Sequence, residues 1–496
     1  MALATGQRSP FTLSEADSAR LLDRLKRAVM RSRRAGAPGT TLATLSVDLP
    51  GGIDPCAVAY ASRRAGERWF LFEQPDRGGA ALAALGQAAV IEATGPQRFS
   101  AVATRWRELC AHAADAAAGE QGESAGGGPI AVGGFAFAPD GGAAPHWDGF
   151  PAASLTVPEV ALIRSGATAE DPRGGGEARR VRMTLAACAA ADDVPEQLLA
   201  GLQRRLGELC ERELPLLDPD PTGRFQLASA MPPEHYEQAV ARATQMIRAG
   251  ELEKIVLARE VQVHAPAAYD PGAVFGVLRA EFPSCFVFCV GRGEATLIAA
   301  SPELLVRREG HRVSTLALAG STRRSADPAV DDHLGEQLLR DDSYREEHAI
   351  VARRIARTLR PHAVWVTAAP EPRLVRIANI QHLATPIRAQ LAQPLDALEL
   401  AGLMHPTPAV GGEPLGVAAP LIPALEGLDR GWYSGPVGWT DAAGDGELCV
   451  ALRCALLRGS LARCYAGNGI VAGSEPAREL AETEVKLAAL LPLLSG

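Results

Sequence analysis

A lysine and a glutamate, each at the end of an apolar segment, are the residues of this sequence best placed for proton transfer. Lys254 begins an apolar run, residues 255–258, whose composition is typical of a β-strand. Glu303 follows a Ser-Pro pair where the apolar segment 295–300 ends. A lysine desolvated beside a strand loses part of its preference for the charged form and can act as a base near neutral pH. Taken alone, each residue also fits an ordinary solvated position, the lysine in a loop and the glutamate in a turn or the first turn of a helix.

Carboxylates on two predicted helices could hold a metal ion. Glu347 lies midway along a long helix predicted over residues 331–360. Glu479 and Glu482 are three residues apart on one face of a second helix, predicted over 477–491. Mg²⁺ is a hard ion that takes oxygen ligands, so the two helices could bind one Mg²⁺ between them. The alternatives are a solvated acidic face and a salt bridge to the lysine four residues beyond Glu482.

Further segments of the C-terminal half carry donors or glycines that could contact an anionic ligand. They are a predicted turn at 318–324, the segment 381–386, a Pro/Gly turn at 405–412, a strand-like segment at 450–453 that ends on a cation, and a glycine-rich, hairpin-like segment at 465–471. Each one taken alone fits ordinary turn or strand structure, so none of them identifies a ligand.

The elements that must position these residues are predicted along the whole chain. Strands are expected at 41–49, 68–72, 130–137, 285–290 and 295–300, and helices at 21–34, 95–114, 194–214 and 232–250. Residues 115–128 and 165–180 have the composition of loose insertions. The proline-rich segment 215–223 separates an N-terminal half, residues 1–222, from the half that carries the chemistry, residues 223–496.

Charge and composition exclude several classes of protein. A net charge of −8 with no long basic run argues against a nucleic-acid partner. No run of about 18 apolar residues is present, and we expect no membrane-spanning segment. The nine cysteines are scattered, without a C-x-x-C pair. Reduced, mostly buried thiols explain them better than a disulfide framework, and we expect a cytoplasmic protein.

Several motifs, weak singly, are specific in series. They are K-I-V-L-A-R from residue 254, S-P-E-L-L from 301, L-A-G-S-T-R-R from 318, E-H at 347, H-P-T-P-A from 405, and G-N-G-I-V from 467 followed by E-L-A-E-T. In this order they resemble the chorismate-utilising enzymes, which include isochorismate, salicylate, anthranilate and aminodeoxychorismate synthases. The resemblance is dense over residues 225–496 and thinner over 69–75 and 132–137. It implies an α+β fold, a large sandwich of two antiparallel sheets flanked by helices, like component I of anthranilate synthase.

The resemblance also implies roles for individual residues. Lys254 matches the general base that activates water, and Glu303 matches the general acid that protonates the departing 4-hydroxyl of chorismate. Glu347 and Glu482 match the principal Mg²⁺ ligands, and Glu479 matches a supporting acid of that site. The positions that match the substrate pocket are Gly320, His382, Ala409, Arg453, Tyr465 and Gly467. Chorismate is a dianion, and holding it requires a metal, an arginine and backbone donors.

Two positions favour one branch of the family. Lys254 is similar to the water-adding members, whereas anthranilate synthases carry glutamine there. Ala409 stands where amine-using and lyase members tend to have threonine, so the chain resembles an isochorismate synthase. A salicylate synthase, which adds pyruvate elimination, and a non-catalytic chorismate-binding subunit are the alternatives. The resemblance implies a monomer without a glutaminase subunit, and it leaves open whether the product serves menaquinone, siderophore or salicylate synthesis.

Overall fold

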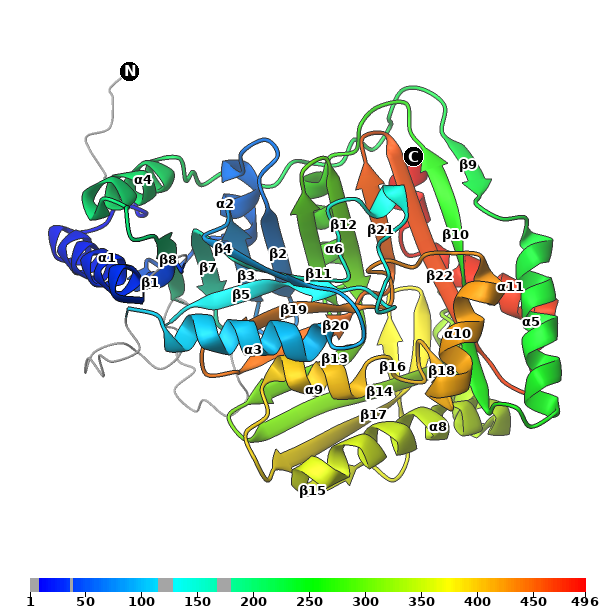
Figure 1. Cartoon of the computed structure of the whole chain (residues 1–496). Helices are drawn as coiled ribbons and strands as arrows, with labels where there is room; N and C mark the ends of the chain where they lie inside the picture. The colour runs from blue at the N-terminus through cyan, green and yellow to red at the C-terminus, as the bar shows by residue number, and fades with distance from the viewer. Residues whose placement is uncertain (1–8, 36–38, 115–127, 167–179) are drawn as a thin grey trace.

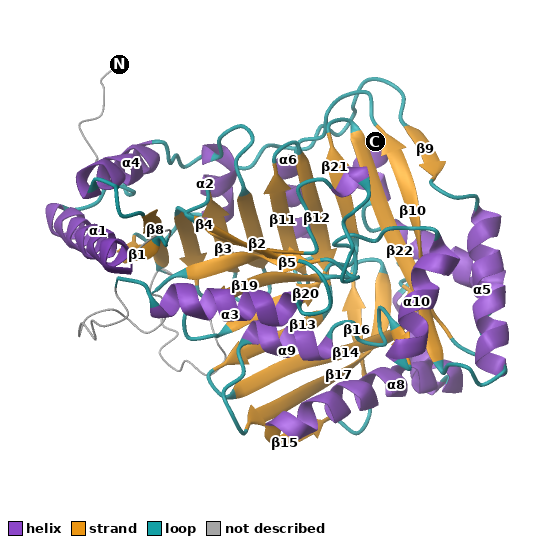
Figure 2. Cartoon of the chain, in the orientation of Figure 1, coloured by secondary structure: helices purple, strands orange, loops and turns teal. Residues whose placement is uncertain are grey.

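The computed structural model describes residues 9–35, 39–114, 128–166 and 180–496, and it contains two large antiparallel sheets (Figures 1 and 2). Within this part of the chain the first sheet has 12 strands. In spatial order they are β1 (Thr41–Leu49), β8 (Val181–Ala189), β7 (Val160–Arg164), β3 (Ala80–Leu85), β2 (Trp69–Gln74), β11 (Phe286–Arg292), β12 (Ala295–Ser301), β21 (Cys454–Arg458), β22 (Leu461–Ile470), β10 (Lys254–His264) and β18 (Gly412–Glu413), with β9 (Gln226–Ser229) also paired to β10.

The second sheet has 10 strands among the described residues. Their order is β15 (Ala363–Ala368), β17 (Ile380–Leu391), β14 (Arg312–Arg323), β13 (Leu304–Glu309), β20 (Gly446–Val450), β19 (Pro436–Asp441), β5 (Ile130–Phe135), β6 (Ala153–Val157) and β4 (Ala89–Ala93), with β16 (Arg373–Ile377) also paired to β17.

Both sheets run without a break from the N-terminal half into the C-terminal half. In the first sheet β2 pairs with β11, and in the second β5 pairs with β19. In Figure 1 the blue and cyan strands therefore continue directly into the green and orange ones. Strands β11 and β12 are buried at every residue, which explains why their sequences are apolar runs rather than alternating patterns. The predicted two-sheet α+β fold is confirmed.

Helices cover the outside of the sheets (Figure 2). They are α1 (Glu15–Ala35), α2 (Pro55–Ser62), α3 (Arg98–Ala111), α4 (Pro195–Gly207), α5 (Pro233–Arg248), α6 (Pro271–Glu281), α7 (Pro328–Arg340), α8 (Asp342–Leu359), α9 (Ala397–Met404), α10 (Leu415–Glu426), α11 (Pro476–Leu487) and α12 (Leu491–Ser495). Two of them decide the geometry of the site, since α8 packs on β14 and β17 of the second sheet and α11 packs on β22 of the first.

The long helix predicted over residues 331–360 is wrong, because the structure has two helices there. Asp341 ends α7 in an extended conformation, and its carboxylate accepts hydrogen bonds from the backbone N–H groups of Ser343 and Tyr344. It is therefore the N-cap of α8, and a cap stabilises a helix start by about 1 kcal/mol. The helix predicted over 194–214 also ends early, at Gly207.

Two segments that were predicted as a turn and a hairpin belong to long strands, and one segment that was predicted as a strand lies mostly in a loop. Residues 318–323 continue β14, and the register of that strand shifts around Gly320, which has φ of 74°. The glycine thus marks a β-bulge rather than a turn. The segment predicted as a hairpin at 465–471 is the end of the straight strand β22. Strand β20 ends at Val450, so Arg453 lies in the connection to β21 rather than in a strand.

Most of the two predicted insertions, 115–128 and 165–180, falls outside the described residues. The nine cysteines are free, as predicted. Within the described ranges no helix is long and apolar enough to cross a membrane.

Candidate active site

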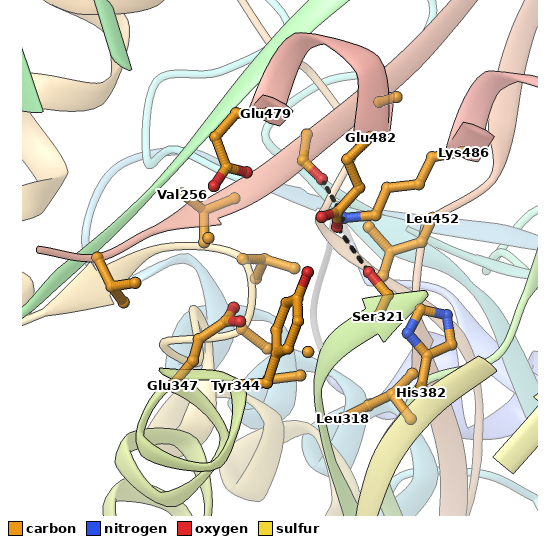
Figure 3. Close-up of a pocket in the computed structure, with 18 of the residues that line it drawn as sticks. Val256, Leu318, Ser321, Tyr344, Glu347, His382, Leu452, Glu479, Glu482 and Lys486 are labelled. Carbon is orange, nitrogen blue, oxygen red and sulfur yellow. Dashed lines mark hydrogen bonds and ion pairs between the residues drawn. The ribbon is translucent and has the colours of Figure 1, made fainter. Parts of the chain in front are cut away.

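A pocket lies where β10 and β22 of the first sheet approach β14 of the second, with α8 on one side and α11 on the other (Figure 3). The structure brings the predicted site residues together at this pocket. Lining it are Glu303, Gly320, Glu347, His382, Ala409, Arg453, Tyr465, Gly467, Glu479 and Glu482. Lys254 is the remaining predicted residue, and its side chain contacts Glu347 beside the pocket.

Lys254 is the first residue of β10 and is completely buried. Its Nζ lies 2.9 Å from Oε1 of Glu347, which α8 carries to this point. A lysine in this position is not a solvated loop residue, so the ordinary alternative for Lys254 does not hold. Strand β10 fixes the lysine by pairing with β22 on one side and β18 on the other.

The close approach of this lysine and glutamate depends on Gly469 of β22. A Cβ atom at Gly469 would lie 2.3 Å from Oε1 of Glu347 and 2.5 Å from Cε of Lys254. Such distances are well below van der Waals contact, so a larger residue at 469 would force the end of one of these two side chains to move. The glycines of this segment were interpreted as an anion-contacting backbone, and the structure gives Gly469 this additional packing role.

Glu303 is buried beyond the end of β12, between the two sheets. Its N–H donates to the hydroxyl of Ser301, and its carbonyl accepts from the N–H of Val450. Burial raises the pKa of Glu303 to about 8, although the positive charges of Lys254 and Arg453 act in the opposite direction. The side chain therefore carries its proton at neutral pH and can donate it into the pocket.

The carboxylates of Glu479 and Glu482 lie in different environments. Burial raises the pKa of Glu479 to about 7, and the negative charge of Glu482 adds to the effect. Burial also acts on Glu482, but Lys486, Ser321 and Arg453 outweigh it and hold its pKa below the usual value. Nζ of Lys486 is 2.8 Å from Glu482, so the salt bridge that was the alternative to metal binding is present.

The charge pattern of the pocket suits a divalent cation. Figure 3 shows Glu347 on one wall and Glu479 and Glu482 on the other, all directed toward the same space. Glu479 feels the charges of both other carboxylates and has no ion-pair partner among the described residues. A cation that takes oxygen ligands would remove this repulsion. The residues present therefore fit a Mg²⁺ ion.

A tighter cluster of possible ligand atoms occurs elsewhere in the described ranges, at Asp54, Cys56 and Glu73. Their ligand atoms lie within 4.8 Å of one another. An arginine already occupies that cluster, because Nη1 of Arg279 is 2.7 Å from Asp54 and 3.5 Å from Glu73. We therefore assign no metal to it.

Arg453 supplies a positive charge to the pocket, and His382 contacts it. Nη2 of Arg453 donates to Nε2 of His382 at 3.0 Å, which requires a neutral imidazole. Burial and the charge of Arg453 hold the pKa of His382 well below its usual value, in agreement with that hydrogen bond. The backbone of Arg453 is left-handed, with φ of 48°, and such strain in a residue other than glycine is concentrated at functional sites.

The structure adds residues that the sequence reasoning missed. Tyr344, Tyr433 and Ser434 all line the pocket. Tyr344 precedes Glu347 by three residues on α8, and this helical spacing could have predicted that the two side chains share a face. Tyr433 stacks on Tyr465 with ring centroids 5.1 Å apart, a contact between two segments that no local pattern predicts.

Comparison with known proteins agrees with this geometry. The sequence model of a family described as chorismate binding enzyme matches residues 27–495. The chain belongs to this family. The salicylate biosynthesis isochorismate synthase of Pseudomonas aeruginosa is 35% identical, over 95% of this chain and 93% of that protein. The isochorismate synthase MenF of Bacillus subtilis is 30% identical, over 90% of this chain and 92% of that protein.

Solved structures of the family share the fold. MenF, the menaquinone-specific isochorismate synthase from Escherichia coli, superposes with a TM-score of 0.73 at 25% identity, covering 96% of this chain and 99% of that one. Anthranilate synthase component I from Streptococcus pneumoniae has a TM-score of 0.59 at 20% identity, covering 91% and 92%, and is alike in fold. The predicted resemblance to chorismate-utilising enzymes is therefore confirmed.

We predict that Gly469→Ala lowers the kcat of the reaction catalysed at this pocket by at least about 100-fold, the usual scale for losing an acid–base group. The added methyl group must displace Lys254 or Glu347, whose flexible ends can move at a cost of about 1–3 kcal/mol in stability. Gly416→Ala, where a Cβ meets nothing within 4 Å, is the control. Steady-state kinetics and a thermal melt separate the two effects. Wild-type turnover by Gly469→Ala would show that the lysine and glutamate need not approach so closely.

Proposed function

We propose that this chain is an isochorismate synthase, which isomerises chorismate by adding water at C2 and releasing the 4-hydroxyl. The observation that carries the proposal is that a buried lysine, Lys254, and a buried, protonated glutamate, Glu303, both lie at or beside one pocket. A substitution of one hydroxyl by another needs a base for the incoming water and an acid for the leaving group. The isochorismate synthases of P. aeruginosa and B. subtilis, similar over most of their length, support this choice.

The proposed reaction conserves atoms without a redox step. The reaction starts from unprotonated Lys254, which accepts a proton from a water molecule while the water oxygen forms a bond to C2 of chorismate. The double bonds of the ring shift, the C4–O bond breaks, and Glu303 gives its proton to the departing hydroxyl, which leaves as water. Loss of the proton from Lys254 and return of a proton to Glu303 restore the starting state. One water enters and one leaves, so the product is an isomer of the substrate.

Glu347, Glu482 and Glu479 would hold Mg²⁺ in this proposal. The bound ion would neutralise these carboxylates and bind a carboxylate of the dianionic substrate. Arg453 would bind the other carboxylate with the backbone at Gly467, and the hydrogen bond from Arg453 to His382 keeps the guanidinium in place. Gly320, Ala409 and Tyr465 would complete the pocket around the ring.

Two side chains support the proposal that water is the nucleophile. Lys254 supplies the base, and Ala409 lines the pocket without a hydroxyl that could order an amine. We therefore propose that the enzyme acts without a glutaminase subunit. Elimination of pyruvate to give salicylate is the alternative activity, and the product mixture distinguishes the two.

The direct test is incubation with chorismate, with and without Mg²⁺, and identification of products by mass and retention time. We expect isochorismate without pyruvate when Mg²⁺ is present, and no turnover after exhaustive treatment with EDTA until Mg²⁺ is restored. Full activity of the metal-free protein would contradict the role of the three glutamates. Pyruvate formed in proportion to product would instead identify a salicylate synthase.

The pH dependence of kcat/KM should report on Glu303. A carboxyl with its pKa raised to about 8 is protonated below that pH and loses its proton above it. Only the protonated form can act as an acid, so we predict that kcat/KM falls as pH rises through about 8. In Glu303→Gln we expect kcat to drop by at least about 100-fold and the alkaline limb to disappear from the residual activity. A variant that keeps both the rate and the alkaline limb would remove Glu303 from the mechanism.

A further inference from the structure

Asn468 links the strand and the helix that meet at the proposed metal site. Its side chain is buried between Gly467 and Gly469 on β22, with only 1% of the residue exposed. Nδ2 donates to Oε2 of Glu479 at 3.0 Å and to the backbone carbonyl of the same residue at 2.7 Å. Oδ1 accepts a hydrogen bond from Nζ of Lys486 at 2.7 Å. All three contacts are made to α11.

These contacts determine which carboxylate Lys486 neutralises. An ammonium group has three N–H donors. Nζ of Lys486 contacts the carbonyl of Gly467 at 3.0 Å, Oδ1 of Asn468 at 2.7 Å and Oε1 of Glu482 at 2.8 Å. These three partners therefore use all three N–H donors of the ammonium group. In Figure 3, Lys486 lies beside Glu482, and Glu479 stands apart on the other side of Glu482.

The contacts also fix the carboxylate of Glu479 without neutralising it. Its hydrogen-bond donors are neutral ones, the amide of Asn468 and the side chain of Ser474. A neutral donor orients one oxygen and leaves the negative charge available to a cation. Residues that orient a ligand in this way typically change metal affinity by about 10- to 100-fold when they are removed.

We propose that Asn468 is a positioning residue of the metal site. It orients Glu479 toward the pocket, and by binding Lys486 it keeps the ammonium group on Glu482, so that Glu479 stays free for a divalent cation. This inference rests on the proposed function, because it takes Glu347, Glu479 and Glu482 as the metal ligands. It assigns Asn468 no contact with the substrate.

Asn379 provides a matched control. Its Nδ2 also donates to a backbone carbonyl of α11, that of Val485 at 2.9 Å. Asn379→Ala therefore removes one amide tether from the same helix, while leaving the contacts of Glu479 and Lys486 intact. Asn468→Ala removes both of those contacts. Asn468→Thr, whose β-branched side chain suits a strand, serves as a second variant because it also lacks the bridging amide.

The experiment measures Mn²⁺ binding by electron paramagnetic resonance of the full-length protein without chorismate, with circular dichroism to confirm folding. We expect the Kd for Mn²⁺ to rise about 10- to 100-fold in Asn468→Ala and Asn468→Thr, and to stay within about twofold of wild type in Asn379→Ala. In the presence of saturating Mg²⁺, the KM for chorismate should change little in any variant, since Asn468 acts through the metal ligands.

Unchanged Mn²⁺ affinity in folded Asn468 variants would overturn the inference while leaving the metal site intact. An equal loss of affinity in Asn379→Ala would also overturn it, by showing that any loosening of α11 has the same effect. Wild-type protein that binds no Mn²⁺ would remove the metal assignment in the proposed function, and the role of Asn468 with it.

Discussion

A lysine and a glutamate with almost no access to solvent, Lys254 and Glu347, face each other at 2.9 Å beside the backbone of Gly469. Removing charged groups from water is costly, and each of these residues is tolerable in this place only because the other is present. Losing one partner of such a pair typically costs about 3–5 kcal/mol, because a buried charge is left alone. The pair also requires three elements to meet, since β10 carries the lysine, α8 carries the glutamate and β22 supplies the glycine.

Lys254 also affects Glu303, the acid of the proposed reaction. Its charge acts against the burial that raises the pKa of Glu303, and yet burial prevails. The pocket thus keeps a neutral acid at one place and a cationic group at another within a single buried network.

The fold and most of the site could be predicted because the informative residues lie in short motifs at characteristic positions. Each of the two motifs around Lys254 and Glu303 marks the end of a strand, and the two-sheet fold places both ends at one pocket. The sequence predictions that were wrong have a common cause. A polar residue near a helix was interpreted as part of it, although Asp341 ends one helix and caps the next. Gly320 predicted a turn, whereas a bulge within a paired strand needs the same positive φ.

No local sequence pattern predicts contacts between parts of the chain that are far apart in the sequence. The steric need for Gly469 depends on side chains that approach from β10 and α8, and the stacking of Tyr433 on Tyr465 joins the turn before β19 to the middle of β22. Whether Lys486 contacts Glu479 or Glu482 likewise depends on Asn468 and on the carbonyl of Gly467. Spacing along α11 alone indicates that Lys486 can reach Glu482, but not that Glu479 lacks an ion pair within the described part of the chain.

The central claim is that water activated at Lys254 replaces the 4-hydroxyl of chorismate, and isotope labelling tests it most directly. Chorismate with oxygen of natural abundance is incubated with the enzyme and Mg²⁺ in water enriched in ¹⁸O, and the isolated product is analysed by mass spectrometry with fragmentation. We predict isochorismate with a single ¹⁸O in the hydroxyl at C2. Isochorismate formed without ¹⁸O would mean that the original hydroxyl migrates within the substrate, and would contradict the assignment of Lys254 as the base that activates water.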